Sequence, residues 1–434
     1  MNAIFMLPFI FLLLSVAITP LISEKFWEKN FAKIILGFTG ITLFSDIFIL
    51  HDIKTPILSI IEYLQFIIFI VVLYIISGGI YLEINKKGTP IVNCLLLLFG
   101  AIISNFIGTT GAATLLIRPF MKINRGRLEP YHIIFFIFIV CNIGGSLSPI
   151  GDPPLFSGFL KGVPFFWTLK HNILPWIIAN GLLLIVFFFL DYNNKKNCCD
   201  VLDKSKIINI QGKMNFIYIL LTLIAIFINP IIIPSLPTIN IFGHNIALIR
   251  EILLTIIGIC AYKKSNRDIL EKNEFTFAPI HELCILFLGI FITMAPALHI
   301  IEDKLQYIDH SIITPTLLYW VAAFFSSFLD NTPTYINSLA VCMSINNADI
   351  SNVHDVLAFS QGLYPNSIEF LRTICLTSVF FGGFTYIGNG PNFMIKAIAE
   401  KNGVKMPSFF TYILKYSFIY LLPILTLIWF IFSR

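Results

Sequence analysis

The sequence predicts an all-α polytopic membrane protein made of two inverted repeats, and three observations support this fold class. First, 57% of the 434 residues are hydrophobic and only 12% are charged, with a mean hydropathy of +0.85, whereas a soluble domain usually carries about 25% charged residues. Second, apolar stretches of roughly 20 residues recur along the chain, and each is long enough to cross a hydrocarbon core of about 30 Å. Third, polar motifs of the first half recur in the same order in the second half.

The apolar stretches are expected to be helices rather than barrel strands. A segment in lipid must satisfy its own backbone hydrogen bonds, which leaves only helices and closed barrels. Barrel strands would be about 10 residues long with alternating polarity, whereas these stretches are longer and uniformly apolar. The first one lacks the basic n-region and the small-residue cleavage site of a signal peptide, so we expect it to be retained. The sequence predicts ten full crossings, at residues 3–22, 32–50, 57–81, 131–160, 171–191, 214–235, 245–262, 277–299, 368–395 and 409–431.

Two further apolar segments, 91–118 and 311–345, are expected to be re-entrant helical hairpins. Lys86 and Lys87 precede the first segment, and four basic residues between Arg118 and Arg127 follow it. Because basic loops face the cytoplasm, both of its ends should lie on that side. The second segment lies in a stretch, between Lys304 and Arg372, that contains no Lys or Arg. Its ends should therefore both lie on the external side.

These assignments give each half five crossings and one hairpin. Residues 1–191 form the first repeat, residues 192–213 a cytoplasmic linker and residues 214–434 the second repeat. An odd number of crossings turns the second repeat upside down relative to the first. The linker and the loops 263–276 and 396–408 are rich in lysine, which places the N-terminus outside.

The internal repeat is visible in two motif pairs. Residues 104–114, SNFIGTTGAAT, align with 326–336, SSFLDNTPTYI, at a constant offset. Residues 144–154, GGSLSPIGDPP, align with 382–392, GGFTYIGNGPN, when one residue is skipped. Glu62 and Glu282 also occupy equivalent places in the third helix of each half. Such self-similarity is typical of repeat architectures.

Polar and Gly/Pro-rich interruptions at matching points of two inverted halves indicate the midplane site of a transporter. Irregular backbone at membrane depth is tolerated only where protein buries it or a wet cavity adjoins it. The hydroxyl, amide and carboxylate oxygens there would suit a small hard cation. The alternative is that these residues only cap restarting helices, as Asp152 before Pro153 could. The predicted binding residues are Ser104, Asn105, Thr109, Thr110, Asp152, Ser326, Asp330, Asn331, Thr332 and Asn389.

Acidic residues within spans are candidates for proton or cation coupling. Asp152 and Asp330 are the strongest candidates, because each lies in an interrupted segment. Two carboxylates in one site would repel each other, which favours exchange of a proton for a cation. Glu62 and Glu282 are further candidates for proton coupling, although both lie near a helix end, where snorkelling is an equal alternative.

Other function classes find less support. The eight cysteines show no metal-ligand spacing, and we expect no cofactor. No P-loop is present, which argues against an ATP-driven pump, and no nucleophile–base set suggests an enzyme. The net charge of +5 is spread over short loops, so we expect no nucleic acid partner. An ion channel remains an alternative.

Four stretches resemble the ion transporter superfamily, most closely its NhaD-type sodium/proton antiporters and related citrate transporters of the CitMHS-like kind. The resemblance covers nearly the whole chain and is carried by the following stretches: SNFIGTTGAATLLIRP, NIGGSLSPIGDPPLF, FAPIHELCILFLGIFITMAPAL and SSFLDNTPTYINSLA.

The resemblance implies a homodimer in which a scaffold domain holds a mobile transport domain that contains both hairpins and both broken helices. In the carboxylate symporters of the superfamily, each hairpin tip carries a Ser-Asn-Thr signature for sodium and a substrate carboxylate. Here the first tip keeps Ser104 and Asn105, but the second departs from the signature at Ser327 and adds Asp330. A fixed negative charge there would disfavour a di- or tricarboxylate.

The sequence therefore predicts a sodium/proton antiporter of the bacterial inner membrane. Sodium would be bound by Ser104, Asn105, Asp330 and Asn331. The alternative within transport is a sodium- or proton-coupled citrate or dicarboxylate transporter.

Overall fold

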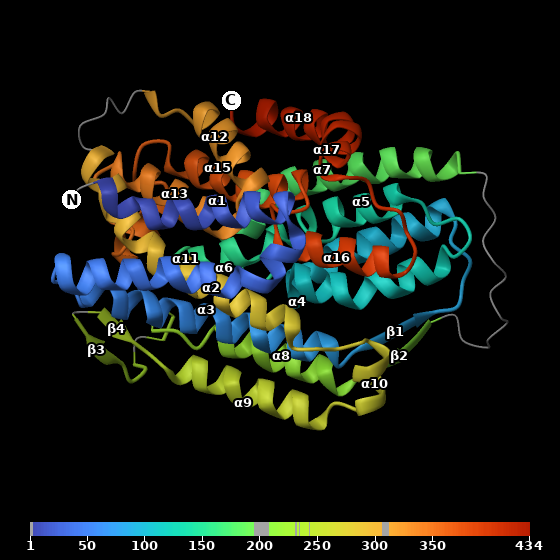
Figure 1. Cartoon of the computed structure of the whole chain (residues 1–434), viewed down its shortest axis with the longest axis horizontal. Coiled ribbons are helices and arrows are strands. Elements are labelled where there is room, and N and C mark those ends of the chain that lie inside the picture. The colour runs from blue at the N-terminus through green and yellow to red at the C-terminus, as the bar shows by residue number, and fades with distance from the viewer. Residues whose placement is uncertain (1–2, 195–207, 231, 234, 243, 306–311) are drawn as a thin grey trace.

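The structure is a computed structural model of the chain, and it describes residues 3–194, 208–230, 232–233, 235–242, 244–305 and 312–434 (Figure 1). These residues are mostly helical. Nine of the described helices are long and apolar enough to cross a membrane. The expectation of a polytopic helical membrane protein is therefore confirmed. Residues 195–207 of the expected linker lie outside the described part.

The elements of residues 3–194 are mainly long helices, with one strand. They are η1 (Ala3–Met6), α1 (Leu7–Ile22), α2 (Glu24–Phe44), the π-helix η2 (Ser45–Ile49), α3 (Lys54–Gly78), β1 (Tyr81–Ile84), α4 (Pro90–Ile123), α5 (Pro130–Ile139), the 3-10 helix η3 (Ile143–Leu147), α6 (Pro153–Lys161) and α7 (Trp167–Tyr192).

The elements after residue 207 include three short strands. They are β2 (Ile208–Gln211), α8 (Met214–Ile226), β3 (Ile239–Ile241), β4 (His244–Ile246), α9 (Ile249–Lys264), α10 (Arg267–Lys272), α11 (Ala278–Leu305), α12 (Pro315–Phe328), α13 (Asn331–Ser344), α14 (Val353–Ser360), α15 (Ser367–Phe380), the 3-10 helix η5 (Phe381–Phe384), α16 (Gly390–Lys401), α17 (Phe409–Tyr412), the π-helix η6 (Ile413–Leu421) and α18 (Leu422–Phe432).

Eight of the ten expected crossings coincide with candidate spans, and two do not. The crossing expected at 214–235 ends at Ile226, because Pro230 cannot donate the next backbone hydrogen bond. The crossing expected at 245–262 is the 16-residue helix α9. Between these helices lies the antiparallel hairpin β3–β4, which the sequence did not predict. The ribbon formed by β1 and β2 was also missed, and it joins the end of α3 to the residues that precede α8.

The first expected hairpin, α4, reverses direction within its length. A straight helix of 34 residues would be about 51 Å long. Instead, the Gly88 backbone N–H donates to the Ile123 carbonyl at 2.8 Å, and the side chains of Asn93 and Asn124 exchange hydrogen bonds of 2.8 Å. The reversal occurs at Gly108, where φ is +77° and ψ is 155°, a conformation that is nearly restricted to glycine. Segment 90–123 thus enters and leaves at the same end.

The second expected hairpin consists of α12 and α13, which contact each other. Leu329 and Asp330 separate the two helices, and both have extended ψ angles, of 162° and 147°. Residue 311 of the expected segment lies outside the described part.

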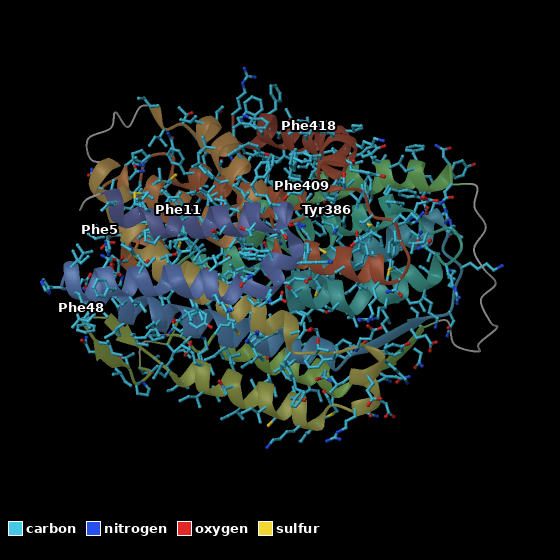
Figure 2. All side chains as sticks on the ribbon, viewed as in Figure 1. Phe5, Phe11, Phe48, Tyr386, Phe409 and Phe418 are labelled. Carbon is cyan, nitrogen blue, oxygen red and sulfur yellow. The ribbon has the colours of Figure 1, made fainter. Side chains whose placement is uncertain are left out.

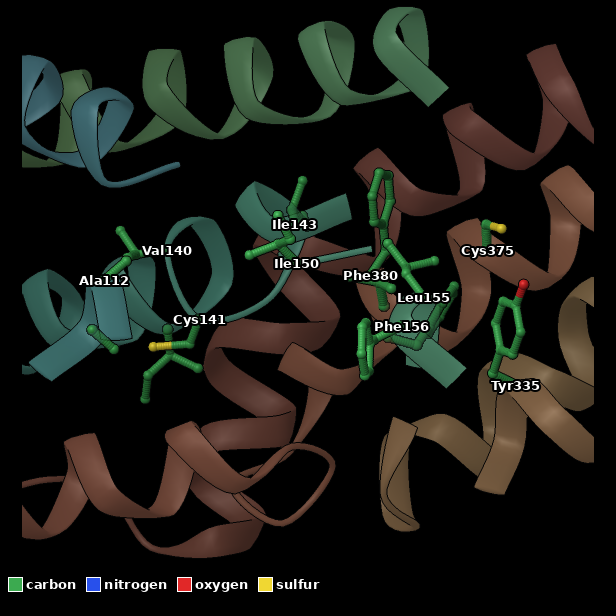
Figure 3. Packing of buried hydrophobic residues seen from close by; sticks show 14 of the residues in the cluster. Ala112, Val140, Cys141, Ile143, Ile150, Leu155, Phe156, Tyr335, Cys375 and Phe380 are labelled. Carbon is green, nitrogen blue, oxygen red and sulfur yellow. The ribbon is translucent and has the colours of Figure 1, made fainter. Parts of the chain in front are cut away.

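Two helices are broken at the expected places. Helix α5 gives way to η3, to extended residues and then to α6. Helix α15 gives way to η5, to extended residues and then to α16. Figure 3 shows the apolar packing around the first break, where Leu155 and Phe156 of α6 lie against α15 and its Phe380.

The remaining surface is apolar over large areas. Phe11, Phe48 and Phe418 are exposed on the outer helices (Figure 2). Large apolar side chains facing outward on many helices are expected where lipid replaces water.

Candidate functional site

The four interrupted segments meet at one carboxylate, that of Asp152. It lies at the start of α6, is fully buried and has extended backbone angles. Thr109 Oγ1 of α4 donates to Asp152 Oδ1 at 2.9 Å, and Asn331 Nδ2 of α13 donates to Oδ2 at 2.9 Å. Asn389 Nδ2, at the start of α16, donates to Oδ1 at 3.3 Å. Each hairpin and each broken helix therefore contributes one side chain to this cluster.

The two hairpins contribute equivalent residues. Thr109 directly follows the reversal at Gly108, and Asn331 directly follows the break at Asp330. Both pairs are related by the same sequence offset that aligns the two motifs. Hence Thr109 and Asn331, which each begin the second arm of their hairpin, donate to the two different carboxylate oxygens of Asp152.

Helix capping does not account for Asp152 or Asn389. Both occupy N-cap positions, yet neither side chain accepts a hydrogen bond from its own helix. Asp330 does act as a cap, because its Oδ1 accepts the Thr332 backbone N–H at 3.1 Å. The capping alternative therefore holds for Asp330 but fails for the two residues at the broken helices.

Ser104 and Asn105 contribute to the framework around Asp152 rather than contacting it. The Ser104 hydroxyl donates to Ala101 O at 2.8 Å within its own helix. Asn105 Nδ2 donates to Gly144 O at 2.7 Å, and Asn105 Oδ1 accepts the Leu147 backbone N–H at 2.9 Å. Both amide atoms of Asn105 therefore tie the first hairpin to η3.

The second hairpin tip is built similarly. The Ser326 hydroxyl lies 3.0 Å from Asn331 Oδ1 and 2.7 Å from Ser378 O, which joins α12 to α13 and α15. Thr332 is fully buried beside this tip.

Two asparagines that the sequence analysis missed complete the framework. Asn142 Nδ2 donates to Asn392 Oδ1 at 2.8 Å, and both side chains are fully buried. Asn389 Nδ2 also donates to Asn142 Oδ1 at 3.1 Å. The only sequence signal was a pair of amides flanking the glycine-rich breaks, because Asn142 precedes Gly144 and Asn392 follows Pro391.

A cavity of about 1020 Å³ leads to this cluster from one end of the molecule. Thr110, Asp330 and Asn389 line its inner part. Its outer part is lined by Glu274 and Lys401, whose side chains are 55% and 71% exposed, so the cavity reaches the surface there. Figure 1 shows this end on the right, with α10 and the β1–β2 ribbon. It is the end that carries the basic loops.

Ion pairs join the two walls of the cavity near its mouth. Glu274, which precedes α11, accepts from Lys401 Nζ of α16 at 2.8 Å and lies 3.7 Å from Arg118 Nη2 of α4. The hydrogen bond from Lys401 and the nearby guanidinium of Arg118 hold the pKa of the Glu274 carboxyl below its usual range. Glu274 thus links α4, which bears Thr110, and α16, which follows Asn389, to the segment before α11.

The other two predicted coupling residues lie apart from Asp152. Glu62 accepts from Lys161 Nζ at 2.7 Å, which pairs α3 with the end of α6. Glu282 lines the cavity. Among the ion pairs of the described residues, none includes Asp152 or Asp330.

The described part of the chain contains no group of three or more His, Cys, Asp or Glu side chains that could hold a metal ion in the usual way. The fold and the buried polar cluster define a polytopic helical transport protein with an open cavity that leads toward a central carboxylate. The chain matches a family described as putative citrate transport over residues 1–433, and it belongs to that family. None of the curated proteins compared with it matches.

Proposed function

We propose that this protein is a secondary active cation/proton antiporter and that sodium is its cation. The observation that carries the proposal is the environment of Asp152, which is fully buried, receives three hydrogen bonds from neutral groups and has no cationic partner among the described residues. Burying an unpaired charge is costly. A bound sodium ion or a bound proton would each neutralise the carboxylate, and exchange of one for the other is antiport.

Asp330 supports a cation over a large anion. It lies at the inner end of the cavity, beside Asn331, which contacts Asp152. A di- or tricarboxylate that entered the cavity would meet Asp330 before it reached Asp152. Ser104, Asn105, Thr110 and Thr332 surround the same region, and their roles as sodium ligands or as framework belong to the proposal. Glu282 could relay protons along the cavity wall.

The proposed movement is that of an elevator. The hydrogen bonds at Asp152 join both hairpins and both broken helices into one unit, as expected for a transport domain. The cavity lies between this unit and parts of α1, α2 and α11, which supply Val16, Phe31 and Leu286 to the opposite wall, and α11 also packs against α13. Sliding of one unit past the other would close the cavity and open a second one at the far end. Two inverted repeats would give both end states related structures.

The alternative is a sodium- or proton-coupled citrate or dicarboxylate transporter, and the family match favours it. Under this alternative, Arg118 and Lys401 at the cavity mouth would attract the anion. Neither hypothesis changes the expected setting, a homodimer in a bacterial inner membrane, which the superfamily resemblance supports.

The test uses everted membrane vesicles with a pH-sensitive dye, to which sodium, lithium, potassium and citrate are added in turn. Sodium should release protons from wild-type vesicles, and Asp330→Asn should abolish the response. Asp268→Asn is the matched control, because Asp268 is an exposed carboxylate on α10 that does not line the cavity. Uptake of labelled citrate that survives in Asp330→Asn, without any sodium response in the wild type, would overturn the antiporter in favour of the carboxylate carrier.

A further inference from the structure

The side-chain amide of Asn389 has more acceptors than hydrogens. Its Nδ2 lies 3.0 Å from Cys141 O, 3.1 Å from Asn142 Oδ1 and 3.3 Å from Asp152 Oδ1. An amide group carries only two N–H hydrogens. The contact with Asp152 is the longest of the three. Asn389 can therefore release Asp152 and still satisfy both hydrogens.

Backbone carbonyls fix the direction of this amide through a relay of three asparagines. Asn392 Nδ2 donates to Gly382 O at 2.7 Å and to Thr385 O at 3.1 Å, which leaves its Oδ1 to accept from Asn142. Asn142 Nδ2 uses its second hydrogen on Ile137 O at 2.9 Å.

The Asn142 Oδ1 atom is consequently left to accept from Asn389. Since each donor group is directed by a main-chain oxygen, none of the three amides can turn over without losing hydrogen bonds.

The remaining atom of the relay is Asn389 Oδ1. The nitrogen side of this amide faces Cys141 O and Asn142, so the oxygen lies on the other side. No described residue donates a hydrogen bond to it, and Asn389 lines the cavity that leads to Asp330. A carbonyl oxygen of this kind is a good ligand for a hard cation.

We propose that Asn142 is a positioning residue for cation binding. It holds the nitrogen side of Asn389 away from the cavity, so that Asn389 Oδ1 faces an incoming cation and Asp152 Oδ1 becomes free to bind it. Asn142 itself does not contact the cation. The inference rests on the proposed exchange of a cation at Asp152 and adds a determinant of its affinity.

The experiment compares Asn142→Leu with the wild type in two measurements. The first is sodium-dependent proton release in everted vesicles over a range of sodium concentrations. The second is the sodium-dependent rise in melting temperature of the purified protein, with choline at equal ionic strength as the reference. We expect Asn142→Leu to raise the half-saturating sodium concentration about tenfold in both measurements, with a smaller change in the maximal rate, because losing one directing hydrogen bond near a charge has roughly this effect.

Two other variants separate positioning from general loss of packing. Asn392→Leu removes one acceptor of Asn142 but leaves Asn142 Oδ1 for Asn389, so the half-saturating concentration should rise less than in Asn142→Leu. Asn180→Leu is the matched control, because Asn180 is a fully buried asparagine that donates only to Trp176 O within α7. It should leave the sodium dependence unchanged.

The outcomes distinguish this inference from the proposed function. A wild type that shows neither proton release nor thermal stabilisation with sodium overturns both. A wild type that responds to sodium, together with an Asn142→Leu variant of unchanged half-saturation, overturns the positioning role alone. An Asn142→Leu variant that loses maximal rate but keeps the wild-type half-saturating sodium concentration would also overturn it.

Discussion

The two broken helices have the same backbone but different side chains at the same point. Asp152 has φ −142° and ψ 142°, and Asn389 has φ −151° and ψ 139°. Each follows a Gly-Gly 3-10 turn and an Ile-Gly pair, and each begins a helix with proline in its first turn.

In both copies the residues after the 3-10 turn close back on a glycine of the Gly-Gly pair, on the second glycine in the first copy and on the first glycine in the second copy. A Cβ on Gly151 would lie 2.0 Å from Gly145 O, and a Cβ on Gly388 would lie 2.6 Å from Gly382 O. Only glycine permits such close approach. The backbone around these glycines is therefore tightly packed in both copies.

The difference lies in hydrogen-bonding character. Asp152 only accepts, from both hairpins, whereas Asn389 donates to Asp152. Two aspartates at these positions would place two charges together, and two asparagines would leave no charge for a cation. Under the proposed function, a duplicated backbone becomes a site for one cation when a single residue differs between the copies.

The largest expected effect comes from removing this difference. Asp152→Asn should reduce sodium-dependent proton release to the level of vesicles without the protein, because no carboxylate remains where the four segments meet. The measurement is dye dequenching after sodium addition, with protein levels matched by immunoblot. Normal exchange in this variant would show that Asp152 carries no part of the reaction.

The opposite change should be nearly as damaging. Asn389→Asp places a second carboxylate within hydrogen-bond distance of Asp152, and an uncompensated buried charge costs about 3 kcal/mol or more. We expect roughly 100-fold slower exchange. The double variant Asp152→Asn/Asn389→Asp restores one carboxylate in the mirrored position and should regain part of the activity. A double variant as inactive as Asp152→Asn would mean that the two breaks are not interchangeable.

A hairpin contact should have an intermediate effect. Thr109→Val removes one hydrogen bond to the Asp152 carboxylate, and such a bond is worth about 1.5 kcal/mol or more. The half-saturating sodium concentration should therefore rise roughly tenfold. Thr114→Val is the matched control, because Thr114 Oγ1 donates only within its own helix, to Thr110 O and Gly111 O at 3.0 Å. Equal effects of the two substitutions would contradict the assignment of Thr109 to the site.

The smallest effect is expected at the cavity mouth. Glu274→Gln weakens the exposed pairs with Lys401 and Arg118, which are worth about 0.2–1 kcal/mol, so the rate should change less than about fivefold. Because the pKa of Glu274 is lowered, its carboxylate is fully charged, and the ion pair fully formed, at any pH above the usual pKa of a glutamate. The ion pair is lost only as the pH falls through the lowered pKa.

The substitution should therefore change the exchange rate equally at neutral and mildly alkaline pH. The measurement is the pH profile of exchange in the variant and in the wild type. A shifted profile in that range would show that this carboxylate takes part in proton coupling.

Much of the fold could be predicted because its signals are local. Glycine, proline and polar residues in apolar runs indicated both hairpin tips and both helix breaks. The predicted end of the crossing at 214–235 was wrong, since hydropathy alone does not register the missing N–H of Pro230. The strands β1 to β4 were missed because each has only three or four residues.

The meeting of the four interrupted segments was predicted from the sequence, whereas the binding roles of their residues stay a prediction. The convergence of Thr109, Asn331 and Asn389 on Asp152 followed from the interrupted segments. Asn142 was missed because its partners lie about 250 residues away along the chain, and only the packed fold brings them together. Asn105 was predicted to bind sodium, which stays a prediction, and in the structure its two amide atoms hydrogen-bond to backbone groups of η3.

The β1–β2 ribbon sets a mechanical limit on the proposed elevator. It holds residues 81–84 against 208–211, between the end of α3 and the start of α8, and its Glu83 also pairs with Lys122 of α4 at 2.9 Å. Only five residues, 85–89, tether β1 to the first hairpin, and a fully extended stretch of that length reaches at most about 18 Å. In the proposed elevator, the first hairpin can lie no farther from β1 than this tether reaches, so shortening the tether by one residue at a time should show at which length the movement is blocked.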